Sequence, residues 1–231
     1  RAGDYVISIT VTGAAVVLGT DDASTLLTNT AEYISALTEF NQGANVALGA
    51  KAFKNCRQMS KLTMPTAGGS SSEQTMNCYS LRLYMLPRNV TRLEDGFQNM
   101  ASLQVLSLPN SIKTIAGYSI TNTNALQRVA LPDGATTLEG GAISTCYGVR
   151  EISLGTNFIM PSAWSMREVK TMRVIKFPGN PNLRIGGSIL RDNDSLEIVA
   201  FTACTVVPPM LGAGAFTDSN DSFRKYQYSY N

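Results

Sequence analysis

Histidine is absent from the 231 residues of this chain. Its absence excludes Ser-His-Asp and Cys-His nucleophile activation, histidine base catalysis, and every metal motif that needs an imidazole. Charged residues make up only 16% of the chain, and the net charge is +2, so nothing draws it globally toward nucleic acid or anionic lipid. No apolar run approaches the roughly 18 residues of a transmembrane helix. The sequence therefore predicts neither a nucleic-acid partner nor a membrane span.

What the chain does contain is a heptapeptide that recurs seven times. It reads apolar-x-x-apolar-x-apolar and is usually followed by proline. Successive copies start 22 to 24 residues apart, and their first positions are Met59, Leu81, Leu103, Leu126, Val149, Met172 and Leu196. A fixed period of this length is the signature of a stacked solenoid. Each turn of a solenoid buries its apolar face only against its neighbours.

Side chains alternate along a strand, so positions four and six of the heptapeptide should point inward. Positions three and five should then point outward, and position two is expected to be exposed as well. Proline after the copy ends the strand because it lacks an N–H and has a fixed φ. We expect each turn to comprise a short strand, a corner, an extended stretch and a short helical or irregular return.

The period divides the chain into three parts. The solenoid should cover residues 34–205 in about seven to eight turns, with a degenerate first copy that starts at Ile34, 25 residues before Met59. Residues 1–33 are expected to form an N-terminal β cap, in which 5–11 and 14–18 pair as a hairpin. Residues 206–231 are expected to form a C-terminal cap, either whole or truncated. We interpret the start at Arg1 as a mature or trimmed form without its targeting segment.

Four cysteines lie at positions 56, 78, 146 and 204, with no CxxC pair among them, so no metal site is predicted. Cys56, Cys78 and Cys146 each precede the first position of a copy by three residues. In the other copies this slot holds Met100, Thr123, Val169 and Asn193. We therefore predict a buried, stacked slot, since free cysteine is among the most buried residue types. Whether Cys56 and Cys78 form a disulfide stays open.

The unit from Ala52-Phe53 through Cys56 to Pro65 closely resembles the BspA-type leucine-rich repeat, and the resemblance extends over about residues 34–216. Glycine and threonine replace the usual proline at Gly155 and Thr202, which should weaken those turns. The resemblance implies a right-handed solenoid, an α/β-type repeat with a parallel β-sheet on one face. It also implies a secreted or outer-surface bacterial protein, often a lipoprotein or an adhesin-like module.

The outward positions of the strands form the candidate binding face. An apolar cluster near its N-terminal end is followed by a basic stretch, and we predict binding through Lys61, Leu83, Met85, Val105, Arg128, Arg150, Glu151, Arg173, Val174 and Lys176. Solenoids often bind through such extended faces. The alternative is that long and β-branched side chains simply suit strand surfaces. Glu151 and Glu197 also lie beside the basic residues and would offset their charge.

The predicted function is non-enzymatic binding or adhesion, without cofactor or metal. The expected partner is a host extracellular-matrix protein, a mucosal glycan or another surface protein; the sequence gives no oligomeric state. One alternative is a structural spacer within a larger surface protein. A less favoured one is a glycan hydrolase that uses Glu94 and Glu139, two turns and therefore roughly 10 Å apart.

Overall fold

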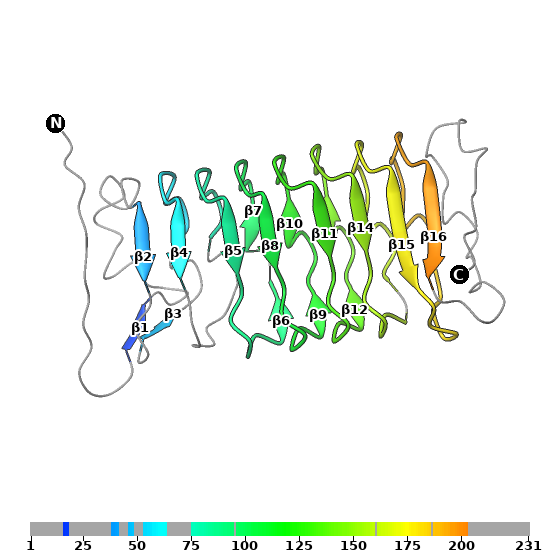
Figure 1. Cartoon of the computed structure of the whole chain (residues 1–231), viewed down its shortest axis with the longest axis horizontal. Helices are drawn as coiled ribbons and strands as arrows, with labels where there is room; N and C mark the ends of the chain where they lie inside the picture. The colour runs from blue at the N-terminus through cyan, green and yellow to red at the C-terminus, as the bar shows by residue number, and fades with distance from the viewer. Residues whose placement is uncertain are drawn as a thin grey trace.

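The computed structural model describes residues 16–18, 38–41, 46–48, 53–63, 75–94, 96–159, 161–185 and 187–202. In these residues the chain winds through successive turns, and the strands of neighbouring turns lie side by side (Figure 1). Every strand pairing is parallel. The parallel solenoid predicted from the heptapeptide is confirmed.

The heptapeptides supply the strands of the front face, here called the sheet face. These strands are β2 (Glu39–Asn41), β4 (Lys61–Thr63), β5 (Leu83–Met85), β8 (Val105–Ser107), β11 (Arg128–Ala130), β14 (Glu151–Ser153), β15 (Val174–Pro178) and β16 (Ile198–Thr202). Hydrogen bonds join them as β2-β4, β5-β8 and β11-β14-β15-β16. Strands β8 and β11 are neighbours in Figure 1 but belong to different hydrogen-bonded sheets. We call this junction the seam.

Two narrower ladders form the back of the coil. One contains β6 (Arg92–Leu93), β9 (Thr114–Ile115) and β12 (Thr137–Leu138), and the other contains β7 (Phe97–Gln98), β10 (Ile120–Thr121) and β13 (Ile143–Ser144). No residue in the described ranges is helical, so the returns are irregular rather than helical. Accordingly, the described part of the chain contains no helix able to cross a bilayer.

The N-terminal register differs from the prediction. Strand β2 pairs with β4 so that Glu39 lies opposite Lys61, an offset of 22 residues. The earlier copy therefore starts at residue 37, not at Ile34. Strand β1 (Val16–Leu18) pairs in parallel with β3 (Val46–Leu48), and the predicted hairpin partner 5–11 lies outside the described residues. The boundaries of the two caps stay predictions.

The core follows the heptapeptide positions. All seven first positions are buried, and so are the described fourth and sixth positions apart from Leu106 and Leu108, which are half-buried beside the seam. Each fully buried aliphatic side chain contributes about 1.5–3 kcal/mol. The slot three residues before each copy is also buried in every described turn, which confirms the stacked position predicted for the cysteines.

Gly155 stands where proline usually follows the heptapeptide. A Cβ atom at this position would lie 2.2 Å from the carbonyl oxygen of Pro132 in the preceding turn. Two backbones therefore approach each other more closely here than any side chain permits. Glycine at this position therefore makes the close stacking of the two turns possible.

The residue before the buried slot has a left-handed backbone in every described turn. Four such residues are asparagines, with φ between 54° and 68°: Asn55, Asn77, Asn99 and Asn122. Their side chains form a chain of hydrogen bonds in which the Nδ2 of each donates to the Oδ1 of the one before, over 2.7–2.9 Å. We call this chain the asparagine ladder. Asparagine suits the slot because its short polar side chain tolerates a positive φ.

The asparagine ladder ends at Asn122. In the next turn the equivalent position holds Thr145, a β-branched residue with a φ of 51°. We expect Thr145→Asn to raise the free energy of unfolding by about 1 kcal/mol, because it relieves backbone strain and can add a hydrogen bond to Asn122. Thermal unfolding should then occur about 2–4 °C higher. Thr145→Gly relieves the strain alone. If Thr145→Gly stabilises the protein as much as Thr145→Asn, the added hydrogen bond to Asn122 contributes nothing to stability.

Candidate functional site

The structure places the predicted binding residues on the sheet face. Strand positions three and five point outward, and the basic residues at position two are exposed just before their strands. Lys61 is exposed and paired with Glu39, while Glu151, Val174 and Lys176 are half-buried. The face is therefore one continuous surface with two chemically different regions, an apolar cluster and a basic strip.

The apolar cluster consists of Leu83, Met85 and Val105, whose exposed fractions are 49%, 60% and 52%. Strands β5 and β8 hold them together, with Leu83 directly opposite Val105. The half-buried Leu106 and Leu108 of the same turn as Val105 pack against the core instead. Three large apolar side chains this exposed are unfavourable in water, and such a cluster often marks an interaction site.

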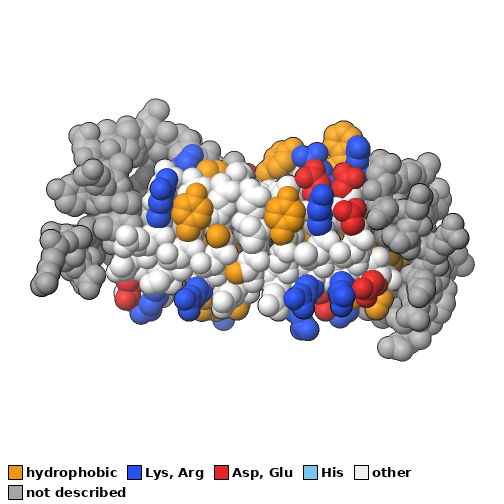
Figure 2. Space-filling view, turned by 90° about the horizontal axis from the view of Figure 1, so that it is seen from above, with side chains coloured by type: hydrophobic (Ala, Val, Ile, Leu, Met, Phe, Trp, Pro, Cys, Tyr) orange, Lys and Arg blue, Asp and Glu red, His pale blue; other side chains and the backbone are white. Residues whose placement is uncertain are grey.

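The basic strip consists of Arg128, Arg150, Arg173 and Lys176. Glu151 binds Lys176 at 2.8 Å and lies 3.9 Å from Arg128, and Glu197 lies 3.4 Å from Arg173. Arg150 is exposed and has no acidic partner among the described residues. Four cations against two carboxylates leave the strip net positive, and Figure 2 shows basic side chains gathered along the edge where the sheet face lies.

The carboxylates of the hydrolase alternative are both bound to one arginine. Arg92 donates from Nε to Glu94 at 2.8 Å and, through both terminal nitrogens, to Glu139 at 2.8 and 3.2 Å. The Arg92 hydrogen bonds hold the pKa of Glu139 below its ordinary value, and the backbone N–H of Gly117 adds to this. A general acid needs a raised pKa, so this geometry gives the hydrolase alternative no support.

The described cysteines are unsuited to act as nucleophiles. Cys56, Cys78 and Cys146 are free thiols with no exposed surface. Burial raises the pKa of all three and takes that of Cys78 to about 12, so almost no reactive thiolate forms at neutral pH. The described residues also contain no group of three or more His, Cys, Asp or Glu placed to hold a metal.

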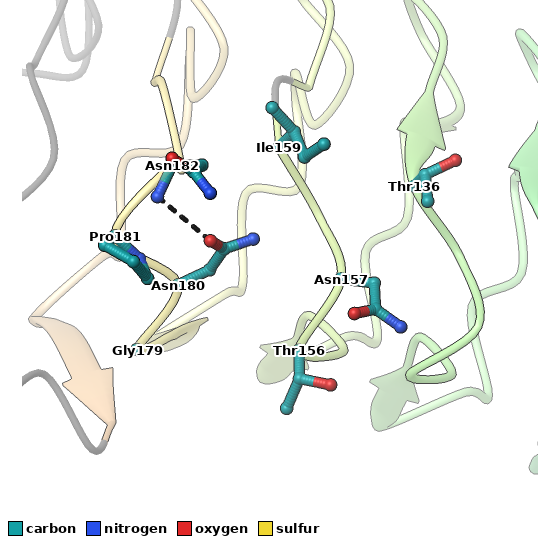
Figure 3. A pocket seen from close by; sticks show the side chains of 8 residues that line it. All are labelled: Thr136, Thr156, Asn157, Ile159, Gly179, Asn180, Pro181 and Asn182. Carbon is teal, nitrogen blue, oxygen red and sulfur yellow. Dashed lines mark hydrogen bonds between the residues drawn. The ribbon is translucent and has the colours of Figure 1, made fainter.

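Two surface features were missed at the sequence level. One is a set of exposed aromatics outside the sheet, Tyr79, Tyr118, Tyr147 and Trp164. The other is a shallow groove of about 540 Å³ on the corner that follows β14 and β15, which Figure 3 shows. The corner after β15 runs from Pro178 to Leu183, two residues longer than the equivalent run from Gly155 to Phe158. That difference in length was the available signal for the groove.

Comparison with known proteins agrees with this geometry. The family model of the BspA type leucine rich repeat region matches six copies, over residues 29–97 and 94–220. No curated protein matches the chain. A leucine-rich repeat protein from Bacteroides ovatus has a similar fold, with a TM-score of 0.54 and 13% identity, over 85% of this chain and 68% of that one.

A leucine rich cell surface protein from Faecalibacterium prausnitzii also matches, with 16% identity and a TM-score of 0.37, over 85% of this chain and 74% of its own. The family assignment does not depend on either structure, because the family model alone spans most of the sequence. The chain belongs to the BspA-type leucine-rich repeat family.

Proposed function

We propose that this protein is a non-enzymatic binding module, displayed on or secreted from a bacterial cell, that docks its partner on the sheet face. Candidate partners are a host extracellular-matrix protein, a mucosal glycan and another surface protein. Of these, the surface chemistry favours a protein that presents apolar side chains beside carboxylates. The location is the one implied by membership of the BspA-type leucine-rich repeat family.

The observation that carries the proposal is the exposed cluster of Leu83, Met85 and Val105. A partner that covers these side chains would remove apolar surface from water, which is worth roughly 25 cal/mol per Å² before the costs of association. The neighbouring basic strip would steer an acidic partner and fix its orientation. Affinity would then arise mainly at the apolar cluster, and selectivity mainly at the basic strip.

The test replaces Arg128, Arg150 and Arg173 together by glutamate. Binding of the native chain and of this variant to immobilised matrix proteins and sulfated glycans is measured by surface plasmon resonance. We expect the variant to bind the ligand at least tenfold more weakly, because each reversal turns an attraction into a repulsion. A companion variant, Leu83→Ser with Met85→Ser, should weaken binding by a similar factor and with little dependence on salt.

The matched control replaces Arg88, Lys113 and Lys170 by glutamate. These residues are also exposed but lie outside the strands of the sheet face, so the net charge changes equally. If the control loses as much affinity as the sheet-face variant, the effect is one of overall charge and the proposed docking surface is wrong. A native chain that binds no ligand of the panel would favour the spacer alternative.

A further inference from the structure

The corner groove arises from a step in the solenoid. Strand β14 has three residues and β15 has five. In each turn a backbone N–H closes the corner by donating to a carbonyl three residues earlier, from Phe158 to Gly155 and from Leu183 to Asn180. The longer strand moves this closing turn two residues further along the chain. One corner therefore projects beyond its predecessor, and the groove lies between them.

Hydrogen bonds fix the walls of the groove. The Nδ2 of Asn157 donates to the carbonyl oxygen of Asp133 at 2.6 Å, and the Nδ2 of Asn180 donates to that of Phe158 at 2.9 Å. The Oδ1 of Asn180 accepts from the backbone N–H of Asn182 at 2.9 Å, the bond drawn in Figure 3. These side chains are held in place before any ligand arrives, which lowers the entropic cost of binding.

The groove still offers free hydrogen-bonding capacity. In the described structure, the Oδ1 of Asn157, the hydroxyl of Thr156 and the side-chain amide of Asn182 have no hydrogen-bond partner. Apolar walls accompany these groups, since Ile159 is 49% exposed and Pro181 is exposed beside it. No charged side chain lines the groove.

This combination selects a class of ligand. An ionic ligand would lose hydration without gaining a counter-charge. A neutral sugar ring presents hydroxyl groups, which pair with amides and hydroxyls, and C–H faces, which pack against apolar surface. The volume of the groove is also within the range of small-molecule sites. We propose that this groove is a binding site for a neutral sugar unit, separate from the sheet face.

The test measures binding of galactose, N-acetylglucosamine and lactose to the native chain by saturation-transfer NMR. We expect at least one of these probes to bind. Asn182→Ala should weaken that binding about fivefold, the worth of one neutral hydrogen bond. The side chain of Asn182 makes no hydrogen bond in the described structure, so the substitution leaves the hydrogen bonds that fix the walls of the groove intact. Ile159→Asp should weaken binding at least tenfold, because it places a charge against the ring.

The matched control is Asn110→Ala, an exposed asparagine at the corner that follows β8, which should leave sugar binding unchanged. Binding that survives both groove substitutions would place the sugar elsewhere and overturn the proposal. So would the absence of binding by all three probes at about 10 mM, where a 1 mM site would be largely filled. The triple arginine variant of the sheet face should keep full sugar binding, so this site and the proposed function can fail separately.

Discussion

Replacing Asn99 by leucine is expected to lower the free energy of unfolding by about 3 kcal/mol. Asn99 donates to Asn77 at 2.9 Å and accepts from Asn122 at 2.8 Å, and each such hydrogen bond is worth about 0.5–1.5 kcal/mol. Its φ of 58° adds about 1 kcal/mol or more of strain for leucine. Thermal unfolding should occur about 6–12 °C lower, as circular dichroism can record.

Asn99→Gly separates the two contributions. Glycine adopts a positive φ without strain but offers no side-chain hydrogen bond. We expect this variant to lose roughly the two hydrogen bonds alone, so its midpoint should lie between those of the native chain and of Asn99→Leu. Equal midpoints for the two variants would mean that backbone strain plays no part. A leucine variant as stable as the native chain would show that the asparagine ladder does not contribute to the free energy of unfolding.

The second large effect is expected at Gly155. An added Cβ would meet the Pro132 carbonyl oxygen at 2.2 Å and its carbon at 2.4 Å, and both belong to backbone that cannot rotate away. Gly155→Ala must therefore separate two stacked turns, at an expected cost of about 3 kcal/mol or more. Chemical denaturation should show a lower midpoint. Hydrogen exchange should be faster in β11 and β14, the strands that this contact holds in register.

Gly140→Ala provides the comparison for Gly155→Ala. A Cβ atom at Gly140 would lie 3.2 Å from the carbonyl oxygen of Ala163, a tight contact that a shift of a few tenths of an ångström relieves. We expect a loss below about 1 kcal/mol. Equal losses for the two alanine variants would indicate that the close approach at Gly155 relaxes easily, and would contradict the role assigned to it.

The sequence was sufficient to predict the features that repeat in every turn. The inward and outward positions of the strands follow from the apolar heptapeptide, and the buried cysteines follow from their fixed offset to it. The asparagine ladder was equally periodic, at 55, 77, 99 and 122. The sequence did not predict it, because regularly spaced asparagines have no evident structural role until it is known that each of them has a left-handed backbone conformation.

Features that depend on a difference between turns were harder to predict. The groove results from a corner two residues longer than its neighbour, and an alignment of the heptapeptides alone does not reveal it. The first copy was placed three residues early because Ile34 and Leu37 both fit an apolar first position. Only the pairing of Glu39 with Lys61 decides between them.

The seam has a mechanical consequence. On the sheet face no pairing of the described strands crosses the seam, and the continuous sheet β11-β14-β15-β16 lies C-terminal to it. The turns on its two sides are joined instead by the last hydrogen bond of the asparagine ladder, from Asn122 to Asn99, and by the back pairings β9-β12 and β10-β13. The solenoid should therefore flex at the seam about an axis that lies away from the sheet face. Flexing would change the spacing between the apolar cluster and the basic strip, letting one surface fit partners of different curvature.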